Sequence, residues 1–217
     1  MTKSVFASSK WSLKKSKLAV LVPCRDTLHS AFAMCLTELV KLNTMNNLDT
    51  HVIMDASTVL LTQRERLALE AQNIGAEYML WLDSDMTFPA TTALRLLAHN
   101  EDVVAANYIR RQLPAKGVAY ETIGAWEEPL PFEIQDDLVP VEGVGMGCML
   151  VKTSILQEIE QPWFEFKWTP ESNDHLGEDM MFCQKMAAQG YQVKIDTNLS
   201  MEMRHLGTWA FGPELLK

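Results

Sequence analysis

Two aspartates lie two residues apart where an apolar run ends, in the segment Trp81-Leu82-Asp83-Ser84-Asp85. We predict a buried strand over Tyr78 to Leu82, and side chains two apart on a strand face the same way, so both carboxylates can meet at one point. Ligands of open α/β sheets bind just outside the carboxyl ends of the strands, where paired carboxylates suit a divalent cation that carries a diphosphate. The same residues also fit a polar turn before a helix at Pro89, because Asp and Ser are common in turns.

Strands and helices alternate in the half of the chain that would position these aspartates. Runs of branched and aliphatic residues indicate strands, and apolar residues with a period of about 3.6 indicate helices. The expected order is a strand at Lys17 to Pro23, a helix opened by Thr27, a strand at His51 to Met54 ending at Asp55, a helix from Ser57 or Thr58 to Gly75, the strand before Asp83, a helix from Pro89 and a strand at Val103 to Tyr108. This order predicts right-handed βαβ units and a mostly parallel sheet flanked by helices.

The pattern changes after Arg111. Residues 112–140 contain four prolines and no sustained period. The elements expected next are a glycine-rich strand at Glu142 to Lys152, an irregular aromatic segment at Gln161 to Asp174, a helix from Gly177 to Gly190 and a strand at Tyr191 to Ile195. We therefore expect an α/β protein with a basic tail (residues 1–16) and a single Rossmann-like domain (17–217). Its nucleotide-binding half would be 17–111, and its acceptor and catalytic half 112–217.

Composition narrows the class of protein. The net charge of the 217 residues is −9, and the first seventeen hold five lysines and no acid, so the rest of the chain is more acidic than the total. An acidic body is a poor non-specific binder of nucleic acid. No run approaches the roughly 18 apolar residues of a membrane span, and the four cysteines show no metal-binding spacing. We expect a cytoplasmic protein with reduced thiols and no integral membrane segment.

Five polar features follow one another in an informative order. They are Pro23-Cys24-Arg25 after the first strand, Asp55 after the second, Arg64 and Arg66 on the next helix, the Asp83 and Asp85 pair, and Glu178-Asp179 followed by Met203-Arg204-His205-Leu206-Gly207. With these motifs the sequence resembles the GT-A glycosyltransferases, most closely the compact family 2-like enzymes. The resemblance runs from about Lys17 to Gly207 and implies the GT-A (nucleotide-diphospho-sugar transferase) fold.

The resemblance implies a metal site. Asp83 and Asp85, with Ser84 between them, match the DxD element of the family. In the family this element holds the ribose and the metal that bridges the diphosphate. His205 matches a late histidine that completes this site in many members. An imidazole beside carboxylates favours Mn²⁺, with Mg²⁺ as the alternative. Taken alone, a histidine such as His205 is more often a surface or hydrogen-bonded residue than a metal ligand, and the order of the motifs is what favours the ligand.

The resemblance also implies a catalytic pair. Asp179 matches the aspartate that serves as general base in inverting members, which must lie near the acceptor hydroxyl. Glu178 would position acceptor or donor hydroxyls. The alternative is that two acids at a helix start merely interact favourably with the helix dipole.

Further residues are candidates for holding the donor. Asp55 matches a position that contacts the base in relatives, where its carboxylate would accept from the uracil N–H; a strand-end turn is the other interpretation. Arg25 and Arg64 suit phosphate oxygens because guanidinium groups form paired hydrogen bonds, and Pro23 lies at the same edge. Arg64 and Arg66 cannot share one face of a helix, and we favour Arg64.

Two further segments each have two possible interpretations. The glycines of Gly143-Val144-Gly145-Met146-Gly147 either let the backbone approach the donor sugar or form a plain turn. The aromatic residues Trp163, Phe164 and Trp168 either stack on sugars or close over the core.

The expected function is metal-dependent, hexosyltransferase-type glycosyl transfer from a nucleotide-sugar donor, expected to be UDP-linked, to an unidentified hydroxyl acceptor. Inversion at the anomeric carbon is the expected outcome. The alternatives are a sugar-phosphate nucleotidyltransferase, although Pro23-Cys24-Arg25-Asp26 is not a glycine-rich phosphate loop, and a non-catalytic nucleotide-sugar-binding module. Fold alone does not decide among them.

Overall fold

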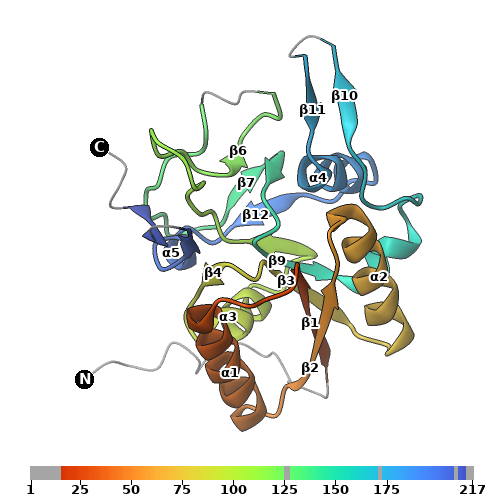
Figure 1. The fold of residues 1–217 in the computed structure, drawn as a ribbon, viewed down its shortest axis with the longest axis vertical. Helices are drawn as coiled ribbons and strands as arrows, with labels where there is room; N and C mark the ends of the chain where they lie inside the picture. The colour runs from red at the N-terminus through yellow and green to blue at the C-terminus, as the bar shows by residue number, and fades with distance from the viewer. Residues whose placement is uncertain (1–15, 125–127, 171–172, 208–209, 214–217) are drawn as a thin grey trace.

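A mixed sheet of seven strands runs through the centre of the protein, shown as a computed structural model in Figure 1. In spatial order the strands are β2 (Asp49–Ala56), β1 (Lys17–Cys24), β3 (Tyr78–Leu82), β9 (Cys148–Lys152), β5 (Val103–Ala105), β12 (Val193–Ile195) and β7 (Val139–Val141). Five of the seven run in one direction, and β9 and β7 run against them. The predicted α/β class and mostly parallel sheet are confirmed at this coarse level.

The structure describes residues 16–124, 128–170, 173–207 and 210–213. The predicted basic tail, apart from Ser16, lies outside these residues. Among the helices in the described ranges, none combines the length and the apolar character that crossing a membrane requires. The division of the chain into a tail and one domain with two halves stays a prediction.

Helices cover both faces of the sheet. The helix α1 (Ser30–Met45) leads from β1 to the edge strand β2, and α2 (Leu60–Asn73) leads back to β3 on the other side of β1. Because such crossovers are right-handed, this reversal puts α1 and α2 on opposite faces of the sheet. In Figure 1, α3 (Thr92–Ala98) lies beside α1. The other described helices are α4 (Glu178–Ala188), α5 (Thr197–Ser200) and a 3₁₀ helix at Thr153–Gln157.

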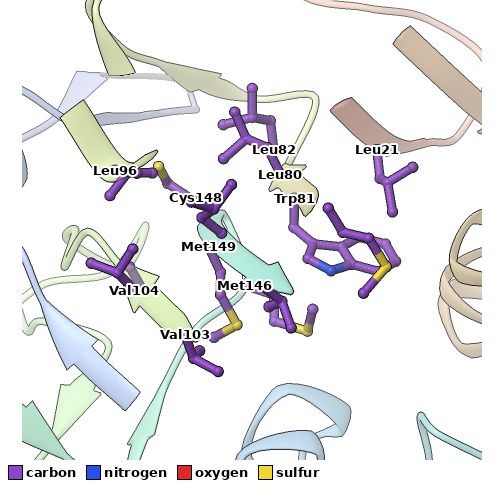
Figure 2. Packing of buried hydrophobic residues seen from close by; sticks show 14 of the residues in the cluster. Leu21, Leu80, Trp81, Leu82, Leu96, Val103, Val104, Met146, Cys148 and Met149 are labelled. Carbon is purple, nitrogen blue, oxygen red and sulfur yellow. The ribbon is translucent and has the colours of Figure 1, made fainter. Parts of the chain in front are cut away.

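The central strand β3 is enclosed on every side. Four of its five residues are completely buried, and Tyr78 is 4% exposed. Figure 2 shows Leu80, Trp81 and Leu82 packed in one cluster with Cys148 and Met149 of β9. Each large apolar side chain buried in this way contributes about 1.5–3 kcal/mol to stability. The strand that ends at the two aspartates is therefore firmly anchored.

Short strands form three smaller sheets beside this central sheet. They are β4 (Met86–Thr87), β13 (Arg204–Leu206) and β14 (Ala210–Phe211) in one sheet, β6 (Ala119–Tyr120) with β8 (Gly143–Val144), and β10 (Lys167–Thr169) with β11 (Asp174–Leu176). In Figure 1 the β10–β11 pair projects above α4. Its strands belong to the segment that we expected to be irregular, so that prediction was wrong for Lys167–Thr169.

Several predicted boundaries differ from the structure. The first helix begins after His29, whose ring nitrogen accepts from the Ala31 N–H at 3.2 Å, and Thr27 does not cap it. The third helix begins at Thr92, because the Pro89 carbonyl accepts from the N–H and the hydroxyl of that threonine in a preceding turn. The strand expected to reach Tyr108 ends at Ala105.

Candidate functional site

The candidate site lies where β1, β2 and β3 end together at one edge of the sheet. Pro23 on β1 lies opposite Asp55 on β2, and Asp83 follows the last residue of β3. The chain leaves β1 toward β2 on one side and reaches β3 on the other, so this edge is a point where the strand order reverses. Ligands of open α/β sheets bind at such points.

A buried arginine connects the first aspartate to the predicted catalytic helix. Arg64 on α2 is 2% exposed; its Nη2 contacts Oδ1 of Asp83 at 3.2 Å, and its Nε contacts Oε1 of Glu178 at 3.2 Å. Its guanidinium also lies 5.4 Å from the centre of the Trp81 ring. Burial alone would lower the pKa of Arg64, but the charges of Asp83 and Glu178 raise it above its usual value. Within the described residues Arg64 joins two carboxylates, whereas we had predicted contact with the donor.

The second aspartate lies in a more open environment. Asp85 forms an ion pair with Arg111, whose Nη1 lies 2.9 Å from Oδ2, and Nε2 of His205 lies 3.5 Å from its other oxygen. Its side chain is 31% exposed. Burial alone would raise the pKa of Asp85, but the hydrogen bond with His205 and the charges of His205 and Arg111 hold it below its usual value.

Strand pairing brings His205 to this place. β13 pairs with β4 so that His205 lies opposite Met86, and the N–H of Leu206 donates to the carbonyl of Asp85 at 2.7 Å. The Nδ1 of His205 is within hydrogen-bond distance of the Ile109 carbonyl, at 3.2 Å, which leaves Nε2 to face Asp85. The predicted neighbourhood of Asp85 and His205 is therefore present.

The donor set fits a divalent cation only in part. Carboxylate and imidazole are suitable ligands for Mn²⁺, and Asp85 and His205 supply one of each. Asp83, the third predicted ligand, contacts Arg64 instead. Among the described residues no group of three His, Cys, Asp or Glu side chains is arranged to hold a metal ion. The remaining positions around a cation would have to come from the ligand or water.

Asp179 faces a cleft of roughly 800 Å³ that opens between the β10–β11 pair and the start of α4. Gly177 precedes the helix, and a Cβ there would lie 2.7 Å from Oδ1 of Asp179, so glycine leaves room for this carboxylate. Burial, followed by the neighbouring charge of Glu178, raises the pKa of Asp179 to about 6. A carboxylate with this pKa can accept a proton effectively near neutral pH.

The other predicted donor contacts do not share the ion pairs of Arg64 and Arg111. Asp55 is within 3.7 Å of Nη1 of Arg66, whose side chain is 63% exposed. The amide of the buried Gln63 donates to the carbonyls of Cys24 and Asp55 and so joins the ends of β1 and β2. Arg25 is exposed, and Ser84 is half-buried between the two aspartates. Nothing in these contacts tests the roles that we predicted for Asp55, Arg25 and Ser84.

The glycine-rich stretch makes room for a tyrosine that the sequence analysis missed. A Cβ on Gly145 would lie 2.5 Å from the Tyr108 hydroxyl oxygen, and one on Gly147 would lie 2.7 Å from its ring. The Gly147 N–H donates to that hydroxyl at 3.1 Å. Burial, together with the charges of Asp83 and Asp179, raises the pKa of Tyr108 well above its usual value. Close packing against a side chain explains both glycines without a donor sugar.

The aromatic segment divides into a buried part and an exposed part. Trp163 and Phe164 are 4% and 2% exposed, and Phe164 stacks on Phe182 with ring centres 4.7 Å apart. These two residues close over the core, as one of our two interpretations expected. Trp168 on β10 is 49% exposed and makes an edge contact with His175.

Two neighbouring arginines were also missed. Arg111 contacts Asp85, and Arg110 lines the cleft that Asp179 faces. Their position directly after a predicted strand was the available signal, since successive side chains of an extended segment point to opposite sides.

Comparisons with known proteins establish similarity of fold only. The crystal structure of A197 from STIV has a TM-score of 0.58 and 16% sequence identity, covering 92% of this chain and 91% of that chain. The crystal structure of a glycosyltransferase involved in the glycosylation of the major capsid of PBCV-1 has a TM-score of 0.35 and 15% identity, over 67% of this chain and 68% of that chain, which is too distant to carry an argument. Neither protein-family models nor curated proteins gave a match.

Proposed function

We propose that the protein is a metal-dependent glycosyltransferase of the GT-A type, which moves one sugar from a nucleotide-diphosphate donor to an acceptor hydroxyl. One observation carries the proposal: a carboxylate whose pKa is raised to about 6, Asp179, faces an open cleft while it also interacts electrostatically with Asp83 at the end of β3. A proton acceptor thus lies beside the edge of the sheet where a nucleotide would bind. The order of motifs along the chain supports the same proposal.

In this proposal Asp85 and His205 hold a Mn²⁺ or Mg²⁺ ion, which when bound would stabilise the negative charge that develops on the leaving diphosphate. Arg111 already forms an ion pair with Asp85 and would exchange this partner for phosphate oxygens when the donor binds. Asp55 would contact the base at the end of β2, which favours a uridine nucleotide.

Asp179 would take the proton from the acceptor hydroxyl as that oxygen attacks the anomeric carbon. The bond from that carbon to the diphosphate breaks in the same displacement, so the product is inverted. Glu178, held by Arg64, would fix the start of α4 and with it the position of Asp179. This assignment makes Arg64 and Glu178 positioning residues.

A thermal-shift experiment with UDP, GDP and ADP, each with and without Mn²⁺, tests donor binding. A ligand that binds only the folded protein raises the unfolding temperature by mass action. We expect the largest increase in unfolding temperature when UDP and Mn²⁺ are present together. In the Asp85→Asn variant, the part of this increase in unfolding temperature that depends on Mn²⁺ should be lost. Asp102→Asn is the matched control, because Asp102 is also an ion-paired aspartate, but it precedes β5 and so lies at the opposite edge of the sheet. Equal shifts for the three nucleotides regardless of Mn²⁺ would contradict the proposal.

A further inference from the structure

The side chains of Arg110 and Arg111 lie in two different parts of the candidate site. Nη1 of Arg111 contacts Asp85, while Arg110 lines the cleft that Asp179 faces. The backbone of this segment is extended, with an isolated bridge between Ile109 and Gly117 and a hydrogen bond from the Arg110 N–H to the Lys116 carbonyl. One arginine therefore serves the predicted donor side and the other the cleft.

Arg110 is held in a fixed orientation by an aromatic side chain. Its Nη2 donates to the hydroxyl of Tyr120, and its guanidinium lies 5.5 Å from the centre of the same ring. Tyr120 is completely buried, so it provides a rigid support. Among the described residues no carboxylate forms an ion pair with Arg110, which leaves most of its N–H donors available to a ligand.

A second cation lines the same cleft. Lys167 on β10 is exposed, and within the described ranges it has no ion-pair or hydrogen-bond partner for its ammonium group. By contrast, Lys152, Lys185 and Lys194 each contact a carboxylate at 2.6 to 2.7 Å. Within the part of the chain that the structure describes, a protein with net charge −9 thus has two cations in one cleft that contact no carboxylate.

The acids of this cleft are already engaged by the backbone. Asp174 accepts from the His175 N–H at 2.7 Å, and Asp179 accepts from the Met180 N–H at 2.8 Å. The raised pKa of Asp179 further reduces the negative charge near pH 6. These acids therefore do not neutralise Arg110 and Lys167 through direct contacts.

We propose that the cleft binds an acceptor that carries an anionic group, either a carboxylate or a phosphate, and that Arg110 recognises this group with assistance from Lys167. The inference rests on the proposed function, because it takes Asp179 as the base that acts on the hydroxyl of the same acceptor. Guanidinium forms paired hydrogen bonds with both carboxylate and phosphate, so the chemistry of recognition is shared. The cleft volume of roughly 800 Å³ is in the usual range for small-molecule sites.

Isothermal titration with simple sugars tests this inference. D-glucuronate and glucose 6-phosphate are the acidic probes, and glucose is the neutral one, each titrated in the presence of saturating UDP and Mn²⁺. We expect at least one acidic probe to bind about tenfold or more tightly than glucose. Arg110→Gln should remove most of this preference, and Lys167→Gln should reduce it less. Lys41→Gln, an exposed lysine of α1, is the matched control and should leave the preference unchanged.

The outcomes separate this inference from the proposed function. If UDP binds with Mn²⁺ but the acidic probes bind no better than glucose, the inference is overturned and the glycosyltransferase proposal remains. If the preference survives Arg110→Gln but is lost in Arg111→Gln, the anion binds beside Asp85 and the inference is also overturned. If the acidic probes depend on Arg110 while UDP does not bind, the anion site remains and the proposed function fails. Arg110→Lys, which retains the charge, replaces Arg110→Gln if that variant does not fold.

Discussion

Asp83 and Asp85 are two residues apart on the chain, yet they lie in different electrostatic environments. Asp83 contacts Arg64, whose side chain is 2% exposed, whereas Asp85 contacts Arg111, whose side chain is 49% exposed. Arg64 has a second carboxylate partner in Glu178, and Asp85 has a second partner in His205. The first arrangement is a buried network that connects α2, β3 and α4. The second is an open cluster at the end of the same strand.

The difference teaches which aspartate is available to a ligand. Removing one partner from a buried ion pair leaves an uncompensated charge, which is costly. An exposed pair contributes little, so its partners can exchange for a cation or a phosphate at low cost. We infer that Asp83 maintains the structure of the site and that Asp85 is the residue free to exchange its partner.

The largest expected effect comes from breaking the buried network. Arg64→Met leaves Asp83 and Glu178 without their shared cation, and we expect a loss of about 3–5 kcal/mol in the free energy of unfolding. Urea denaturation at pH 7 measures this loss. Arg66→Met is the control, because Arg66 lies two residues further along α2 but is 63% exposed, and its effect should stay below about 1 kcal/mol. Similar losses for both variants would show that the buried network has no special importance.

A stabilising effect, opposite in sign, is expected at Asp179, the proposed general base. The pKa of Asp179 is raised from 3.8 to about 6 by folding, so its ionisation opposes folding at pH 7 and this cost disappears as the pH falls below about 4. Asp179→Asn should therefore stabilise the protein at pH 7 by up to about 3 kcal/mol, an increase of up to roughly 6–12 °C in Tm, with no gain at pH 4.

Asp85→Asn should have the reverse effect. The pKa of Asp85 is lowered in the folded protein, so its carboxylate stabilises the fold above its ordinary pKa, and this contribution is lost as the pH falls. We expect slightly lower stability at pH 7 and no difference from the native protein in strong acid. Thermal unfolding across pH 3 to 8 measures both variants. A destabilising Asp179→Asn at pH 7 would contradict the raised pKa.

The smallest effect is expected at the open cluster. Arg111→Met should cost about 0.2–1 kcal/mol in stability at low salt. The difference should shrink further in 1 M salt, where the Debye length is about 3 Å. Paired denaturation curves at the two salt concentrations test this expectation. A loss as large as that of Arg64→Met would show that the two aspartates do not differ as described here.

The sequence by itself determined the local features of the site. The apolar run Tyr78–Leu82 forms a strand with the predicted bounds, and α4 begins at Glu178 directly after Gly177, as predicted. Burial periodicity and turn chemistry are properties of neighbouring residues, so they can be read from a single segment. They placed each carboxylate at the end of its element.

Only the tertiary structure decided which charges meet. Arg64 and Glu178 are 114 residues apart, and the sequence did not indicate that one buried arginine would join Glu178 to Asp83. The glycines at 145 and 147 were ambiguous until the ring of Tyr108 was found against them. The physical reason is that ion pairing and close packing depend on how strand ends and helices assemble in space. Local periodicity carries no information about that assembly.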